Sequence, residues 1–172
     1  GGETKVTSNA PLRGGKSQLY EGGIRVPLIV RWPGETPAGK VTSQPTTNVD
    51  FYPTLLKATS VAPNKKQTLD GVSMLDTWRD PEVAPKRAAM YWHYPLEKPH
   101  FLGGRSGGAI RSGSWKLIEF FDTNSVELFH LDSDPSEKTN LAAQRPNKRH
   151  ELHTQLIRWR KSVGATKAAP KR

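Results

Sequence analysis

The stretch from Gly108 to Leu131, GAIRSGSWKLIEFFDTNSVELFHL, decides the fold of this chain. It holds three apolar runs at strand periodicity, residues 108–111, 115–121 and 126–131, separated by two segments rich in Ser, Gly, Asp and Asn. Short polar connections of this kind join neighbouring antiparallel strands. Another apolar run, Ala88 to His93, precedes them. The sequence therefore predicts a four-stranded antiparallel meander.

An amphipathic helix is predicted after the sheet. Residues from about 147 to 163 place apolar side chains on one helical face and basic side chains opposite. The apolar positions are Leu152, Leu156, Ile157 and Trp159. Because the sheet has an apolar face to bury, we expect this helix to pack on it, and with the helices expected earlier in the chain the fold class is α/β.

The first half of the chain has a different organisation. Residues 1–23 are rich in glycine and indicate irregular backbone, followed by Ile24 to Trp32, which has the apolar, β-branched profile of a buried strand. Helices are expected at about 50–59 and 73–79. The charged, proline-bearing stretch 81–87 is interpreted as the join between two structural units.

Composition restricts the partners. The net charge is +10 with a sequence pI of about 10.0, which favours nucleic acid, acidic lipid or a sulfated polysaccharide without choosing among them. There is no zinc-ligand spacing, P-loop or nucleic-acid motif, and no apolar stretch near the roughly 20 residues of a membrane helix. We expect neither nucleic acid nor a membrane as partner. Without cysteine, disulfides and thiolate metal sites are excluded.

A series of short motifs, in order, resembles the formylglycine-dependent sulfatases, an arylsulfatase-like family of the alkaline-phosphatase superfamily. The matching segments are residues 12–16, 20–27, 32–34, 50–56, 69–73, 109–117, 127–131, 134–137 and 140–141. The resemblance covers residues 1 to about 160. It implies that the chain is the C-terminal portion of an alkaline-phosphatase-like sulfatase fold.

The resemblance also implies a domain division. Residues 1–85 would end the large α/β sulfatase domain and supply an active-site loop, and residues 86–163 would form the C-terminal subdomain of antiparallel sheet plus helix. Residues 164–172 would be a flexible basic tail. The strand at 26–32 would belong to a large sheet whose other strands are missing from this chain, so we expect its flanks to be exposed.

The implied activity is hydrolysis of sulfate esters of carbohydrates or aryl compounds. In the family a formylglycine, made from Cys or Ser in C/S-x-P-x-R, attacks sulfur while a divalent cation, usually calcium, polarises the sulfate. Here the Ser-x-Pro segments at Ser43 and Ser133 lack the final Arg. Gly1 and Gly2 resemble glycines that directly follow metal ligands. We expect formylglycine, cation and metal ligands to come from a missing N-terminal half, and this chain alone to be inactive.

Lys16 matches the family's lysine that contacts the substrate sulfate, and a compact ammonium on a long stem suits that catalytic role. From the local sequence alone, a solvated loop lysine is the alternative. His93, His100 and Arg105 are substrate-binding candidates, because His93 ends a strand and the loop that follows, with His100 and Arg105, can bring aromatic and cationic groups toward a bound sugar. Packing between the two structural units is the alternative for His93.

Three charged residues are given structural roles. Arg13 is expected to pair with a carboxylate or carbonyl, Glu21 to accept backbone N–H bonds or pair with Arg25, and Asp50 to cap a helix.

Other functions remain open at this stage. The chain could belong to a phosphoester or phosphonate hydrolase of the same superfamily, or be a non-catalytic basic module that binds a polyanion. By analogy with the family, we expect an exported protein, periplasmic or extracellular.

Overall fold

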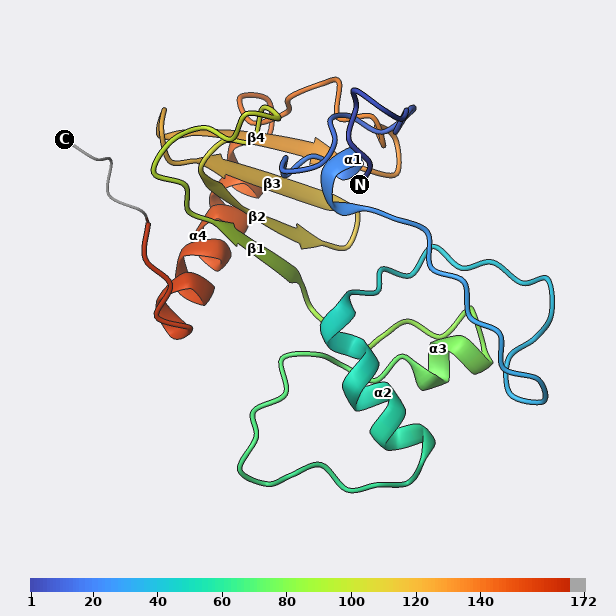
Figure 1. Cartoon of the computed structure of the whole chain (residues 1–172). Helices are drawn as coiled ribbons and strands as arrows, with labels where there is room; N and C mark the ends of the chain where they lie inside the picture. Colours follow the sequence, from blue (N-terminus) through green and yellow to red (C-terminus); the bar gives the residue numbers. More distant parts are fainter. Residues whose placement is uncertain (168–172) are drawn as a thin grey trace. The chain divides into compact units, whose positions relative to one another are not determined.

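The computed structural model describes residues 1–167 and divides the chain into two compact units (Figure 1). One unit combines residues 1–27 with the described residues from 88 to 167, and the other spans residues 28–87. The second boundary lies close to the expected join near residue 86. Residues 1–27, however, pack with the C-terminal sheet, because Leu19 belongs to its apolar core. Of the expected basic tail, residues 168–172 lie outside the described residues.

The predicted four-stranded meander is confirmed. Strands β1 (Met90–Tyr94), β2 (Gly107–Ser112), β3 (Trp115–Phe120) and β4 (Ser125–His130) pair antiparallel in the order β1-β2-β3-β4. Gly113, with φ of 56°, and Asn124, with φ of 51°, take left-handed conformations in the two tight connections. Such residues give hairpin turns a twist that matches the strands.

Successive side chains of a strand point to opposite faces of the sheet, and here apolar side chains lie on both faces. One face, called the loop face, packs against the N-terminal segment; its buried cluster is Leu19, Ala109, Ile118, Phe120, Phe129 and Leu131. The other, called the helix face, packs against α4 (Pro146–Ser162); its cluster is Ile110, Leu117, Leu128, Ala142, Leu152 and Leu156. Figure 1 shows α4 behind the sheet and the short helix α1 (Glu21–Ile24) in front of it. The predicted packing of the C-terminal helix on the sheet is confirmed.

The strand predicted at Ile24 to Trp32 is wrong in this structure. Residues 25–32 form no strand, and the side chains of Val26 and Ile29 are 64% and 91% exposed. A strand requires hydrogen bonds from a neighbouring strand, and none of the four described strands pairs with this segment. The expected exposure around residues 26–32 is therefore observed, as an extended segment without a sheet.

The unit of residues 28–87 contains the two predicted helices. A short 3-10 turn, η1 (Asn48–Asp50), leads into α2 (Phe51–Ala58), and α3 (Leu75–Arg79) follows. Asp50 does not cap α2 as expected. Its buried carboxylate accepts the N–H of Thr47 and of Val72, and pairs with Arg87 at 2.6 Å, so it fixes three segments of this unit together.

Among the described helices, none has the length and apolar character required to span a membrane.

Candidate functional site

Lys16 lies in an exposed turn of the N-terminal segment. Its side chain has no ion pair or hydrogen bond within residues 1–167, and its backbone N–H donates to the Gly2 carbonyl at 3.0 Å. The flanking residues Gly14 and Ser17 take left-handed conformations, with φ of 74° and 72°. For Ser17 that conformation is strained, as residues at functional sites often are. The turn therefore presents a free ammonium group on backbone that is held in place.

Asn9 clamps this turn, a role that the sequence did not reveal. Its Nδ2 donates to the carbonyl oxygens of Gly2, at 2.8 Å, and Gly14, at 3.2 Å. Its Oδ1 accepts the N–H of Gly2 at 3.0 Å. The presence of an Asn inside a glycine-rich loop could have indicated this role, because its side-chain amide can form hydrogen bonds with backbone groups that have no backbone partner.

A hollow of about 240 Å³ lies directly beside the Lys16 turn. It is lined by Ser17, Gln18, Leu19, Gly23, Ile24, Trp92, His93 and Tyr94. The hydroxyl oxygen of Ser17 is buried without a hydrogen-bond partner. Gln18 Nε2 donates to the Leu102 carbonyl at 3.1 Å, so the loop between β1 and β2 is attached to this same region.

His93 contributes to the rim of the hollow, but its imidazole lies on the helix face of the sheet. Its neighbours in β1, Trp92 and Tyr94, pack into the loop-face cluster. His93 Nε2 is 2.9 Å from the carbonyl oxygen of Thr166, and its ring is 5.6 Å from that of Phe121. Strand alternation therefore separates this imidazole from Lys16.

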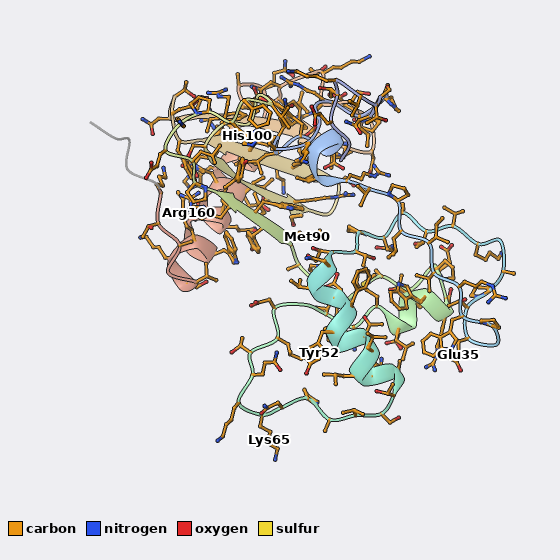
Figure 2. All side chains as sticks on the ribbon, in the orientation of Figure 1. Glu35, Tyr52, Lys65, Met90, His100 and Arg160 are labelled. Atoms are coloured by element: carbon orange, nitrogen blue, oxygen red, sulfur yellow. The ribbon has the colours of Figure 1, made fainter. Side chains whose placement is uncertain are left out.

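The other two substrate-binding candidates lie in the loop between β1 and β2. His100 is labelled in Figure 2; its Nδ1 accepts the N–H of Leu102 at 3.2 Å, and its ring stacks on that of Phe101. Arg105 forms two hydrogen bonds with Asp122, at 2.9 and 2.8 Å. These bonds hold the pKa of Asp122 below its ordinary value. The structure thus brings the loop of His100 next to the Lys16 turn, while Arg105 is engaged in an internal pair.

The structural roles expected for Arg13 and Glu21 are confirmed. Arg13 Nη1 donates to the Glu137 carbonyl at 2.9 Å, and Glu21 pairs with Arg25 at 3.9 Å. Glu21 also pairs with Lys116, a residue that the sequence analysis did not single out. Its position could have predicted its burial, because Lys116 lies two residues before Ile118 in β3 and so points to the same, buried face.

Within residues 1–167 there is no group of three or more His, Asp or Glu side chains that could hold a metal ion. The described residues of this chain therefore do not make a cation site by themselves.

Comparison with known proteins gives consistent matches. The family model described as N-sulphoglucosamine sulphohydrolase, C-terminal, matches residues 15–162. A protein named "Sulfatase" from Formosa agariphila is 36% identical over 154 residues, covering 86% of this chain and 28% of that protein. The chain thus spans less than a third of that relative.

Solved structures also match most of this chain and about a third or less of their own length. Ps i-CgsB in complex with k-i-k-neocarrahexaose aligns with a TM-score of 0.79 and 29% identity, covering 92% of this chain and 34% of that one. A protein solved in complex with its substrate D-glucosamine-2-N,6-O-disulfate aligns with a TM-score of 0.65 and 30% identity, covering 77% of this chain and 27% of that one.

Proposed function

Because the chain belongs to the sulfatase family of the alkaline-phosphatase-like superfamily, we propose that it is the C-terminal part of an enzyme that hydrolyses sulfate esters. The observation that carries the proposal is Lys16, an exposed ammonium without a partner among the described residues, on a turn held by Asn9 and beside a hollow. A free cation on a backbone that is held in place can stabilise the charge on a transferring sulfate group.

Lys16 acts by electrostatics in this proposal. As the bond between sulfur and the ester oxygen breaks, negative charge develops on the leaving oxygen, and the sulfate oxygens carry charge throughout. An ammonium within hydrogen-bonding reach stabilises that charge without transferring a proton. Since Lys16 already has its loop conformation, little reorganisation is needed when the substrate arrives.

The described residues do not fit a metal site, so we assign the divalent cation and the formylglycine nucleophile to the rest of the polypeptide. When bound there, they would supply the Lewis acid and the attacking oxygen. This chain would supply the Lys16 contact and the loop of His100 on the substrate side. Alone, it is expected to be inactive.

A sulfated sugar is the substrate that we favour over an aryl sulfate. The supporting comparison is the 30% identical protein whose substrate is D-glucosamine-2-N,6-O-disulfate. The net charge of +10 also suits a substrate or polymer that carries sulfate groups. In this proposal His100 is the candidate for contact with the sugar, because its loop lies next to the Lys16 turn.

The test uses Lys16→Ala in the complete protein, with 4-nitrophenyl sulfate and D-glucosamine 6-sulfate as substrates. Losing a charge that acts in the transition state should lower kcat/KM about 100-fold or more. Lys138→Ala, which removes an exposed lysine from a turn after β4, is the control and should stay within about twofold of the parent.

Equal activity of the Lys16→Ala protein and its parent would remove the role assigned to this lysine. Faster turnover of 4-nitrophenyl phosphate than of the sulfate would favour a phosphoester hydrolase. Salt-sensitive binding of heparin without any turnover would favour a polyanion-binding module.

A further inference from the structure

A buried ion cluster of Lys116, Glu21 and Glu137 lies on the loop face of the sheet. The Lys116 side chain is fully buried, with its Nζ 3.0 Å from Glu21 Oε1 and 2.9 Å from Glu137 Oε1. Glu21 and Glu137 are both buried, with side-chain exposures of 2% and 0%. Three of the motifs that carry the family resemblance meet here, since the three residues come from β3, from the start of α1 and from the turn after β4.

The buried ion cluster holds both ends of the segment that contains Lys16. At one end, Arg13 Nη1 donates to the Glu137 carbonyl at 2.9 Å. At the other, the N–H of Glu21 donates to Glu137 Oε2 at 2.6 Å. The two ends are also joined directly, because the Gly22 N–H donates to the Arg13 carbonyl at 2.8 Å.

The closure at Gly22 leaves no space for a side chain. A Cβ at this position would lie 2.5 Å from the Arg13 carbonyl oxygen and 2.3 Å from that of Gly14. Contacts at both ends therefore restrain residues 13–22, in addition to the Asn9 contacts within the segment, while Lys16 in the middle stays exposed.

We infer that the buried ion cluster positions Lys16, and that Lys116 is a positioning residue for the sulfate contact. The inference rests on the function proposed above. Lys116 itself is 0% exposed, so it cannot touch a substrate and must act through Glu21 and Glu137.

The charge of Lys116 is what keeps two carboxylates together in the interior. Burial raises the pKa of Glu137, and the ammonium of Lys116 opposes that rise. The remaining cations near Glu21 are more distant, with Arg111 at 3.7 Å and Arg25 at 3.9 Å. Without Lys116, one carboxyl must take up a proton or move toward water, and either change disturbs the hydrogen bonds at the ends of segment 13–22.

The test compares Lys116→Met with Arg160→Met in the complete protein. Methionine keeps the length and apolar stem of each side chain but removes its charge. Arg160 pairs with buried Glu119 on the helix face, so its loss removes a buried cation, although Lys167 still pairs with Glu119. Among the described residues, Arg160 has no hydrogen bond or ion pair with segment 13–22. We expect Lys116→Met to lower kcat/KM for 4-nitrophenyl sulfate about tenfold or more, mainly through kcat, and Arg160→Met to stay within about twofold.

A second readout does not require activity. Hydrogen exchange of the amides in residues 13–23, followed by mass spectrometry, should be at least about tenfold faster in Lys116→Met than in the parent and unchanged in Arg160→Met. If Lys116→Met does not fold, Lys116→Gln replaces it. Glutamine removes the same positive charge but keeps a polar group that can donate to the carboxylates, and the same direction is expected.

The outcomes separate this inference from the proposed function. Equal losses in Lys116→Met and Arg160→Met, or no change in either readout, would overturn the positioning role. Faster exchange in Lys116→Met alone, in a parent protein with no sulfatase activity, would instead refute the proposed function and leave the anchoring of the segment intact.

Discussion

At the scale of single residues, the inner strand β3 buries two opposite charges on opposite faces. Lys116 points to the loop face and Glu119 to the helix face, where Arg160, labelled in Figure 2, and Lys167 donate to the Glu119 carboxylate. Burial alone would raise the pKa of Glu119, but these bonds and the nearby imidazole of His153 hold it well below its ordinary value. Each buried charge is therefore stabilised by opposite charges, and these come from elements other than β3.

The pH dependence of stability should differ between Glu119 and Glu137. A carboxyl with a lowered folded-state pKa stabilises above its unfolded pKa, about 4.3, and this stability is lost as the pH falls toward the folded pKa. Glu119→Gln should therefore reduce stability at pH 7 and flatten the loss between about pH 5 and pH 2. The check is the urea midpoint of the variant and its parent across that range.

Glu137→Gln is the counterpart with the opposite sign. Because the pKa of Glu137 is raised in the folded state, the unfolded state loses this proton first as the pH rises above about 4.3, and the free energy of unfolding falls. Glu137→Gln cannot ionise, so the variant should lack this decrease in stability. Identical pH profiles for the two variants would contradict the assignment.

At the scale of elements, α4 combines an apolar stripe with a charged last turn. Leu152 and Leu156 are buried in the helix-face cluster, and Arg160 continues the same stripe one turn later. Trp159 stacks on Tyr91 of β1 with ring centroids 4.8 Å apart. The helix is thus fixed to the sheet by burial in its middle and by an aromatic contact and an ion pair near its end.

Truncation inside this stripe should be costly. Leu156→Ala removes a fully buried side chain and leaves a cavity, so it should lower the free energy of unfolding by about 2–5 kcal/mol. Arg158→Ala, at an exposed position of the same helix, should change it by less than about 0.5 kcal/mol. Urea denaturation followed by circular dichroism measures both, and equal effects would show that the stripe does not stabilise the fold.

At the scale of the whole molecule, apolar residues of the predicted strand stay exposed, as expected for a strand whose partners are missing from this chain. Val26, Leu28 and Ile29 are 64%, 46% and 91% exposed, in a segment without strand partners. Consecutive exposed residues of this kind usually mark a surface that another part of a protein covers. In the proposed function the rest of the polypeptide would cover this surface, because the chain spans less than a third of its sulfatase relative from Formosa agariphila.

Ile29→Lys should therefore have opposite effects in two settings. In the 172-residue chain it should decrease binding of a hydrophobic fluorescent dye and increase solubility, since an exposed apolar group is replaced by a charge. In the complete protein it should lower the unfolding midpoint, because a charge would be buried. The same sign in both settings would mean that residue 29 is exposed in the complete protein as well.

Much of the fold and the candidate catalytic residue were accessible from the sequence. The four strands and the three longer helices lie close to their predicted bounds, because alternation, helical periodicity and turn residues act over a few neighbouring positions. The order of the motifs identified the sulfatase family and selected Lys16. These signals are local, or depend only on order along the chain.

Only the tertiary structure decided how distant residues combine. The run at residues 25–32 is apolar and β-branched like a strand apart from Pro27, yet it remains unpaired because a strand exists only with a partner. Glu21, Lys116 and Glu137 are unremarkable as isolated sequence positions, and become a buried ion cluster when the fold brings together groups 95 and 116 residues apart. Periodicity fixes which side chains turn inward, but the free energy of a buried charge depends on a counter-charge that only the complete fold supplies.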